Sequence, residues 1–118
     1  MISYKANRIG CEEVDGVLIA GVGNESAGYV MFQRGTTPET GCDEPPYFEF
    51  DDQVNGGNDI LRSVVLRKKQ LLIRTTLPSE GNYFEISLDA AFEDIALLAS
   101  QLRAIFVGYE DKLHLDII

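Results

Sequence analysis

The side chains that could perform acid–base or nucleophilic chemistry are few in this chain and lie far apart in its sequence. There is a single histidine, His114, and there are two cysteines, Cys11 and Cys42. A hydrolytic triad needs a base beside its nucleophile, and a Cys–His pair needs thiol and imidazole together. His114 falls on the polar side of an expected strand, where a solvated imidazole is the simpler interpretation. These residues therefore give no support for nucleophilic catalysis.

The surroundings of the two cysteines also argue against reactive or bridged thiols. Cys42 lies in a loop rich in glycine and proline, and Cys11 stands between a glycine and two glutamates. Acidic surroundings raise the pKa of a thiol. Because no export signal follows the first residues, we expect two reduced thiols in a cytoplasmic protein. Two cysteines and one histidine are also a weak zinc-ligand set, so we expect neither a metal nor a cofactor.

Three further patterns resemble sites but lack their requirements. The glycines of residues 21–28 do not have the dinucleotide-binding spacing and predict a hairpin turn instead. Residues 51–56 lack the alternating acids and the terminal glutamate of a calcium loop. The carboxylates of Glu49 and Asp51 are close in sequence, but nothing supplies the apolar pocket that would separate their pKa values. We therefore expect no catalytic residues and no enzyme.

The composition predicts one acidic domain over residues 1–118. Hydrophobic residues make up 45% of the chain and charged residues 25%, which suits a single core and is too apolar for disorder. Nineteen acids against ten bases give a formal net charge of -9. Such a surface repels phosphate backbones and anionic lipids, so we expect no nucleic-acid partner and no membrane association.

Most of the sequence predicts β-strands separated by turns. Three prolines make residues 35–46 a loop, and residues 55–58 predict a turn. Alternation in residues 47–51 assigns Phe48 and Phe50 to a buried face. The opposite face, carrying Tyr47, Glu49 and Asp51, is then expected to meet water. The expected strands are residues 3–9, 16–22, 29–34, 47–51, 60–67, 71–76, 83–88 and 112–117.

After residue 88 the hydrophobic period changes to that of a helix. Asp89 is the expected N-cap, an apolar stripe runs through residues 90–107, and Gly108 follows the helix end. Strands with one apolar face and a helix with one apolar stripe pack in two layers. The expected fold is α+β: a mostly antiparallel β-sheet with one long C-terminal amphipathic helix packed on one face.

Charges are segregated along the sequence. Residues 35–60 hold seven acids and no base, whereas residues 61–76 hold five bases and no acid. One interpretation is a solvated loop followed by a hairpin whose outer face pairs with it. The other is a docking face that captures a basic partner. The candidate contact residues of that docking face are Glu44, Tyr47, Glu49, Asp51, Asp52, Gln53 and Asp59.

The run of residues 47–57, with its aromatic–Glu, Asp–Gln and glycine elements, resembles the central motif of the bacterial Immunity protein 10 family. The similarity extends over about residues 29–109, including the basic turn at 67–69 and the helix end at 102–108, but the loop at 35–46 departs from it. The resemblance implies a cytosolic antidote that neutralises a toxin from another cell by binding. Many delivered toxins are nucleases with basic active sites, so the implied partner is a basic cognate toxin domain.

Two other classes remain open. The chain could be a small acidic ligand-binding module, or a dimeric scaffold of unknown partner in which an apolar sheet face pairs with itself. Both a monomer and a homodimer therefore stay possible from the sequence. The other class, besides this binding or scaffold module, is an enzyme that uses Asp or Glu chemistry or a metal.

Overall fold

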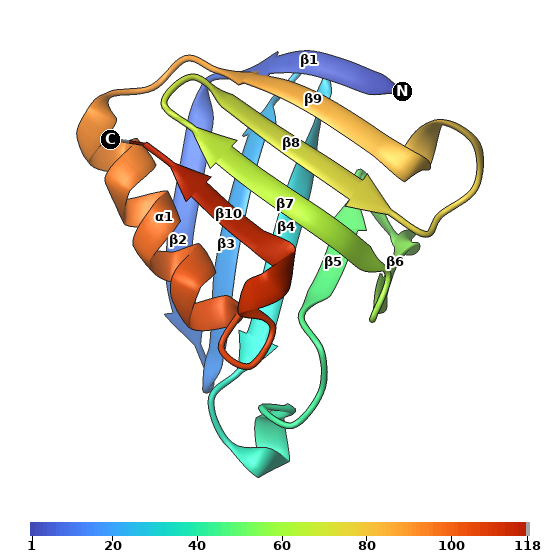
Figure 1. The fold of residues 1–118 in the computed structure, drawn as a ribbon, viewed down its shortest axis with the longest axis vertical. Coiled ribbons are helices and arrows are strands. Elements are labelled where there is room, and N and C mark those ends of the chain that lie inside the picture. Colours follow the sequence, from blue (N-terminus) through green and yellow to red (C-terminus); the bar gives the residue numbers. More distant parts are fainter. Residues whose placement is uncertain (118) are drawn as a thin grey trace.

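The protein forms two five-stranded β-sheets and one α-helix, as seen in a computed structural model that describes residues 1–117 (Figure 1). The strands are β1 (Ile2–Ala6), β2 (Arg8–Val14), β3 (Val17–Asn24), β4 (Gly28–Gly35), β5 (Tyr47–Phe50), β6 (Asp52–Asn58), β7 (Leu61–Arg67), β8 (Gln70–Thr75), β9 (Tyr83–Leu88) and β10 (Leu113–Asp116). The α-helix is α1 (Phe92–Ile105), and the short 3-10 helices are η1 (Pro38–Thr40), η2 (Ser79–Asn82) and η3 (Glu110–Lys112).

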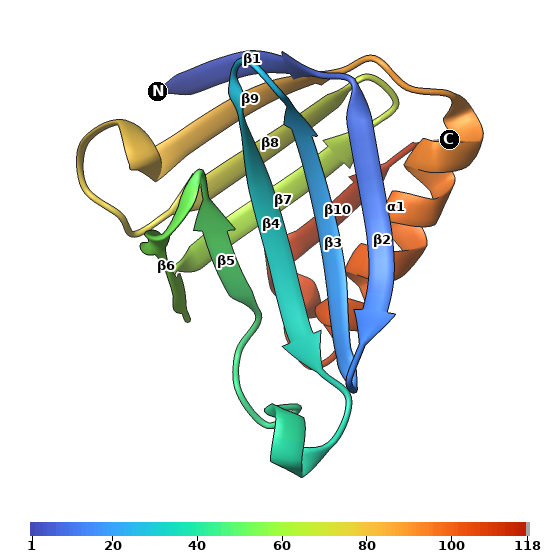
Figure 2. The same cartoon turned by 180° about the vertical axis from the view of Figure 1, so that it is seen from behind.

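The strands divide into two sheets, which corrects the expectation of one. Sheet A has the order β1-β9-β8-β7-β10, and sheet B has the order β2-β3-β4-β5-β6 (Figure 2). Sheet B is antiparallel throughout, whereas β1 and β10 join sheet A in parallel. The chain changes sheets between β1 and β2 and again between β6 and β7. Alternation along each strand reveals its buried face but not its hydrogen-bonding neighbours.

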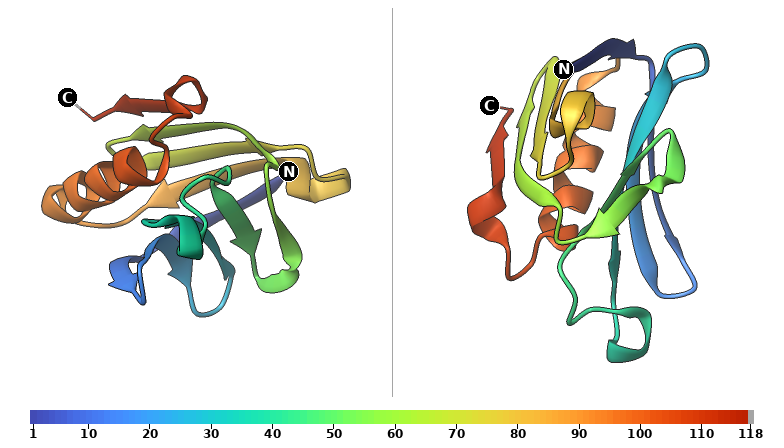
Figure 3. Two further views of the ribbon diagram at one scale, coloured as in Figure 1. Left: turned by 90° about the horizontal axis from the view of Figure 1, so that it is seen from below. Right: turned by 90° about the vertical axis from the view of Figure 1, so that its right-hand side faces the viewer.

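The two sheets face each other (Figure 3), and buried aromatic side chains lie between them. The ring of Phe32 in sheet B lies 5.3 Å from that of Phe48 and 6.3 Å from that of Phe106, centroid to centroid. The Phe48 ring lies 5.5 Å from that of Phe84 in sheet A. All four side chains are fully buried. This line of rings joins both sheets to the end of the helix, so the α+β class of the sequence analysis is confirmed.

Helix α1 fills one flank of the molecule, packing against β2, β3 and β4 of sheet B and against β10 of sheet A. Its buried stripe consists of Ile95, Leu98, Ala99, Leu102 and Ile105. No helix in residues 1–117 has the length and hydropathy needed to cross a membrane.

The ends of the helix differ in part from the expectation. The N-cap is Ala91 and not Asp89, because the Asp89 N–H donates to the carbonyl of Ala6 and so belongs to the end of the β1–β9 pair. Gly108 follows the helix end as expected and has a φ of +86°, which glycine adopts without strain.

Two other local expectations are wrong. Residues 55–58 lie within strand β6 and form no turn, and the expected strand at 3–9 is broken at Asn7. The tight turn instead centres on Asp51, whose φ is 61°. Aspartate tolerates this left-handed conformation better than most residues do.

Arg34 joins three parts of the chain that are distant in sequence. Its guanidinium donates to the carbonyls of Ile105 at 2.8 Å, Val107 at 3.0 Å and Cys42 at 2.8 Å. It also lies over the Tyr109 ring, 5.2 Å from the centroid. One side chain on β4 thus holds the loop after η1 and the last turn of α1.

We expect Arg34→Met to lower the free energy of unfolding by about 2 kcal/mol, because it leaves these carbonyls without their charged donor. Arg34→Lys keeps the charge but not the planar fork, so its loss should be intermediate. Urea denaturation measures both. Arg103→Met, at an exposed position of α1, is the control and should change stability by less than about 0.5 kcal/mol. Equal effects at the two arginines would contradict this role.

Candidate interaction surface

Residues 47–58 of the acidic segment form the β5–β6 hairpin, which lies at the edge of sheet B. Strand β5 pairs with β4 from Gln33 opposite Tyr47 to Val30 opposite Phe50. Strand β6 pairs only with β5, and its register shifts between Phe48 and Phe50. Such a shift bends and twists an edge strand. One side of the β6 backbone is therefore free of strand partners in sheet B.

Asp51, a predicted contact residue, forms hydrogen bonds within the fold. Its Oδ1 accepts the N–H of Tyr29 at 3.0 Å, and its own N–H donates to the Tyr29 carbonyl at 3.2 Å. Gly28, with a φ of +130°, lies against this carboxylate so closely that a Cβ would collide with it. The Asp51 carboxylate is thus a structural link between the hairpin turn and the start of β4.

Glu49 was expected to face water, and this expectation is wrong, because only 3% of the residue is exposed. It does point away from the aromatic core, as alternation predicts. One carboxylate oxygen accepts the hydroxyl of Tyr47 at 2.8 Å, and the other accepts the hydroxyl of Tyr29. Gly56 of β6 lies against Tyr47 and Glu49, where a Cβ would collide. The cover over Glu49 comes from neighbouring strands.

The Glu49 carboxylate helps to raise the pKa of both tyrosines. Hydrogen bonding to Glu49, followed by burial, raises the pKa of Tyr29 to about 12. For Tyr47, burial acts first and the hydrogen bond to Glu49 second, and its pKa is also raised to about 12. Tyr47 is thus a half-buried support of the surface and less of a free anchor than the sequence predicted.

The four other predicted residues are exposed, but they lie at both ends of the hairpin. Asp52 and Gln53 follow the turn, and the Asp52 carboxylate accepts the N–H of Val54 at 3.1 Å. Asp59 lies at the far end of β6, where its carboxylate is 3.6 Å from the Lys112 ammonium. Glu44 belongs to this far end as well, because Asn58 donates to the carbonyl of the adjoining Pro45 at 3.1 Å.

The sequence analysis missed two residues of this surface. Val54 is 84% exposed on β6, between the two acidic ends. Its apolar side chain within a run of polar residues was a signal that could have singled it out. Tyr29 was assigned only to a strand, and nothing local to it indicates a contact with Glu49, 20 residues away.

The acids and bases that are segregated in the sequence do not neutralise each other. In residues 1–117, none of the seven acids at 35–60 forms an ion pair with any of the five bases at 61–76. Asp59 pairs instead with Lys112, outside both segments. The interpretation of a hairpin paired with its own acidic loop therefore has no ion pair to support it, and the exposed Glu39, Asp43, Glu44 and Asp52 have no ion-pair partner within residues 1–117.

The residues first considered for chemistry stay apart. Cys11 and Cys42 are free thiols, and burial, with nearby Asp94 and Asp43 respectively, raises the pKa of each. His114 is exposed on β10, as expected. Within residues 1–117, no group of three or more His, Cys, Asp or Glu side chains is arranged to hold a metal ion.

We expect Glu49→Ala to lower the free energy of unfolding by about 1–3 kcal/mol, because both tyrosine hydroxyls lose a charged acceptor. Glu44→Ala removes the same side chain from an exposed position and should change stability by less than about 0.5 kcal/mol. Urea denaturation separates the two. Similar small losses would mean that Glu49 is solvated.

Alkaline titration tests the same cluster. A folded pKa of about 12 for Tyr29 and Tyr47 exceeds the ordinary value of 10.0, so the fold favours the neutral phenols. The stability that they contribute is fully present below pH 10 and is lost as the pH rises toward 12. Ultraviolet absorbance of tyrosinate should rise later in the folded than in the urea-unfolded chain. In Glu49→Gln the delay should shrink, and an unchanged delay would contradict the assignment.

Comparison with known proteins supplies no family: no family model, no curated protein and no solved structure matches this chain.

Proposed function

We propose that this chain is an immunity protein that neutralises a cognate bacterial toxin by stoichiometric binding through the β5–β6 hairpin, without catalysis. The observation that carries the proposal is the edge strand β6, on which Val54 is 84% exposed between Asp52, which forms no ion pair within residues 1–117, and Asp59, which pairs with Lys112. An open sheet edge that carries an exposed apolar side chain offers a partner both backbone hydrogen-bonding groups and an apolar contact.

An open edge favours a partner that supplies a strand or an extended loop. Its unpaired N–H and C=O groups can extend the sheet into the partner. Antiparallel pairing of two copies centred on Asn55 would set Asp51 of one copy opposite Asp59 of the other. Like charges directly opposite each other are destabilising. The edge thus disfavours the homodimer and favours a basic partner, so we expect a monomer in the free state.

We propose a narrower contact set than the sequence analysis gave. Glu44, Asp52, Gln53 and Asp59 remain in it as exposed residues, and Val54 joins them. The buried Glu49, with Tyr47 and Asp51, becomes the support that holds the hairpin in shape. A rigid support lowers the entropy lost on binding.

The charge of the chain suits a basic toxin domain. A formal net charge of -9 draws a basic partner toward the acidic edge and speeds association at low salt. A nuclease is a fitting example, because its active site is basic in order to hold a polyanion, and an acidic hairpin seated there would exclude the substrate. Such an antidote would act in the cytoplasm.

The test uses the cognate toxin domain, which on this proposal is encoded by the gene beside the one for this chain. Asp52→Lys/Asp59→Lys should slow association with it at least tenfold at low salt and reduce protection in co-expression. Glu13→Lys/Glu93→Lys makes the same change in net charge at exposed positions on β2 and α1, and it should have a smaller effect. Equal slowing in both variants would show only net-charge attraction, and undiminished protection would remove the hairpin from the proposal.

A further inference from the structure

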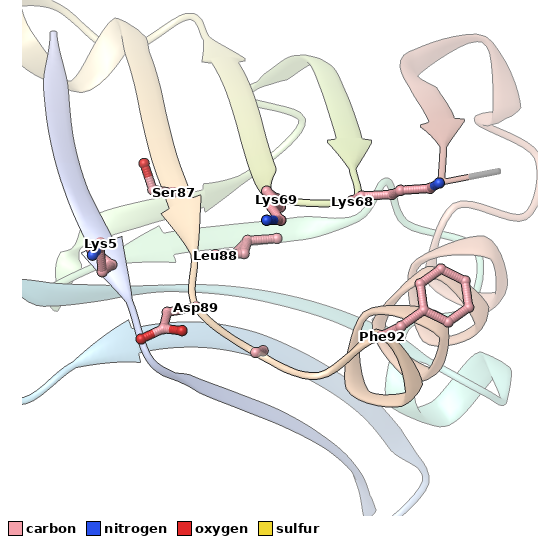
Figure 4. Close-up of a pocket in the computed structure, with 8 residues that line it drawn as sticks. Lys5, Lys68, Lys69, Ser87, Leu88, Asp89 and Phe92 are labelled. Carbon is pink, nitrogen blue, oxygen red and sulfur yellow. The ribbon is translucent and has the colours of Figure 1, made fainter.

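A second surface feature lies away from the β5–β6 hairpin. At one end of sheet A, strand β1, the β7–β8 turn and the segment joining β9 to α1 surround a hollow of about 620 Å³ (Figure 4). Its lining residues are Lys5, Lys68, Lys69, Ser87, Leu88, Asp89, Ala90 and Phe92. This volume falls within the roughly 300–1,000 Å³ of small-molecule sites.

The hollow concentrates positive charge in an acidic protein. The chain has four lysines, and three of them, Lys5, Lys68 and Lys69, line this one hollow. The fourth, Lys112, pairs with Asp59. Within residues 1–117 none of the three lining lysines forms an ion pair, although Asp89 lines the same hollow. Against one carboxylate, the three ammonium groups leave the lining with a net positive charge, which suits an anionic ligand.

Pairing of β1 with β9, and of β9 with the end of the β7–β8 turn, brings Lys5, Ser87 and Lys69 together. Lys5 on β1 stands directly beside Ser87 on β9, and the Leu88 N–H donates to the Lys69 carbonyl at 2.9 Å. Figure 4 shows Lys5 and Lys69 on either side of the strand that carries Ser87. Two ammonium groups and one exposed hydroxyl can thus donate to the oxygens of one phosphate group.

The opposite side of the hollow is apolar. Leu88 and Ala90 lead to Phe92, the first residue of α1, which is 56% exposed. An exposed phenyl ring offers a stacking surface for a planar heterocycle. Asp89 belongs to the same lining and lies in Figure 4 on the side of Lys5, away from the Phe92 ring.

We propose that this hollow binds a mononucleotide-like ligand, with its phosphate on Lys5, Lys69 and Ser87 and its base on Phe92. Lys68 extends on the far side of the turn and adds to the local positive field (Figure 4). The site is independent of the hairpin and of the proposed immunity function.

The test is an amide NMR titration of the whole chain with adenosine monophosphate, inorganic phosphate and adenosine. Adenosine monophosphate should shift the amides of residues 68–69 and 87–93 and bind more tightly than either fragment. The double variant Lys5→Gln/Lys69→Gln should lower the affinity for adenosine monophosphate at least tenfold. Arg103→Gln, which removes an exposed positive charge elsewhere, should leave the affinity unchanged. Phe92→Ala should lower the affinity for adenosine monophosphate at least threefold and leave the affinity for inorganic phosphate unchanged.

Other outcomes overturn the proposal. No shifts at millimolar adenosine monophosphate, or equal binding by the double lysine variant, would remove the phosphate site. If adenosine binds as tightly as adenosine monophosphate, the phosphate is not recognised. If Phe92→Ala binds adenosine monophosphate as tightly as the unchanged chain does, Phe92 does not hold the base. Stronger binding to phosphatidylglycerol vesicles than to the nucleotide would assign the lysines to a lipid headgroup.

Discussion

Burial of the phenylalanine line between the two sheets is the constraint on which the rest of this structure depends. Phe48 is fully buried between Phe32 and Phe84. Because side chains alternate along a strand, this burial directs Tyr47 and Glu49 to the outer face of sheet B. A shift of one residue would place the Glu49 carboxylate among the rings, at a prohibitive desolvation cost. The core thus determines where the polar cluster of the hairpin lies.

The hairpin combines a buried support with an exposed edge. Glu49 is a buried carboxylate that is satisfied by the hydroxyls of Tyr29 and Tyr47 and has no cationic partner within residues 1–117. A carboxylate held in this way stiffens β5 and cannot serve a partner protein directly. The groups open to a partner lie farther out, on β6, where Val54 and the flanking aspartates face solvent. Support and recognition are therefore divided between adjacent strands.

The two surfaces carry opposite charge and lie at opposite sides of the molecule. In Figure 1, β6 lies at the right of the fold, whereas the β7–β8 turn with Lys68 and Lys69 lies at the upper left. Because three of the four lysines line the hollow and lie away from the β6 edge, each surface retains a field of its own. An acidic edge for a basic protein and a basic hollow for a small anion can coexist in a chain of net charge -9.

By itself the sequence determined most of the strands, the helix, the loop at 35–46 and the exposure of His114, because each depends on a local period or on near neighbours. The raised pKa of Cys11, in contrast, comes from burial and from Asp94, not from the adjoining glutamates. It also located the acidic segment. Tertiary structure alone decided that the strands form two sheets, that the turn centres on Asp51, and that Glu49 is covered by Tyr29 and Gly56. These outcomes depend on which distant strands pair, and alternation within a single strand carries no information about its neighbours.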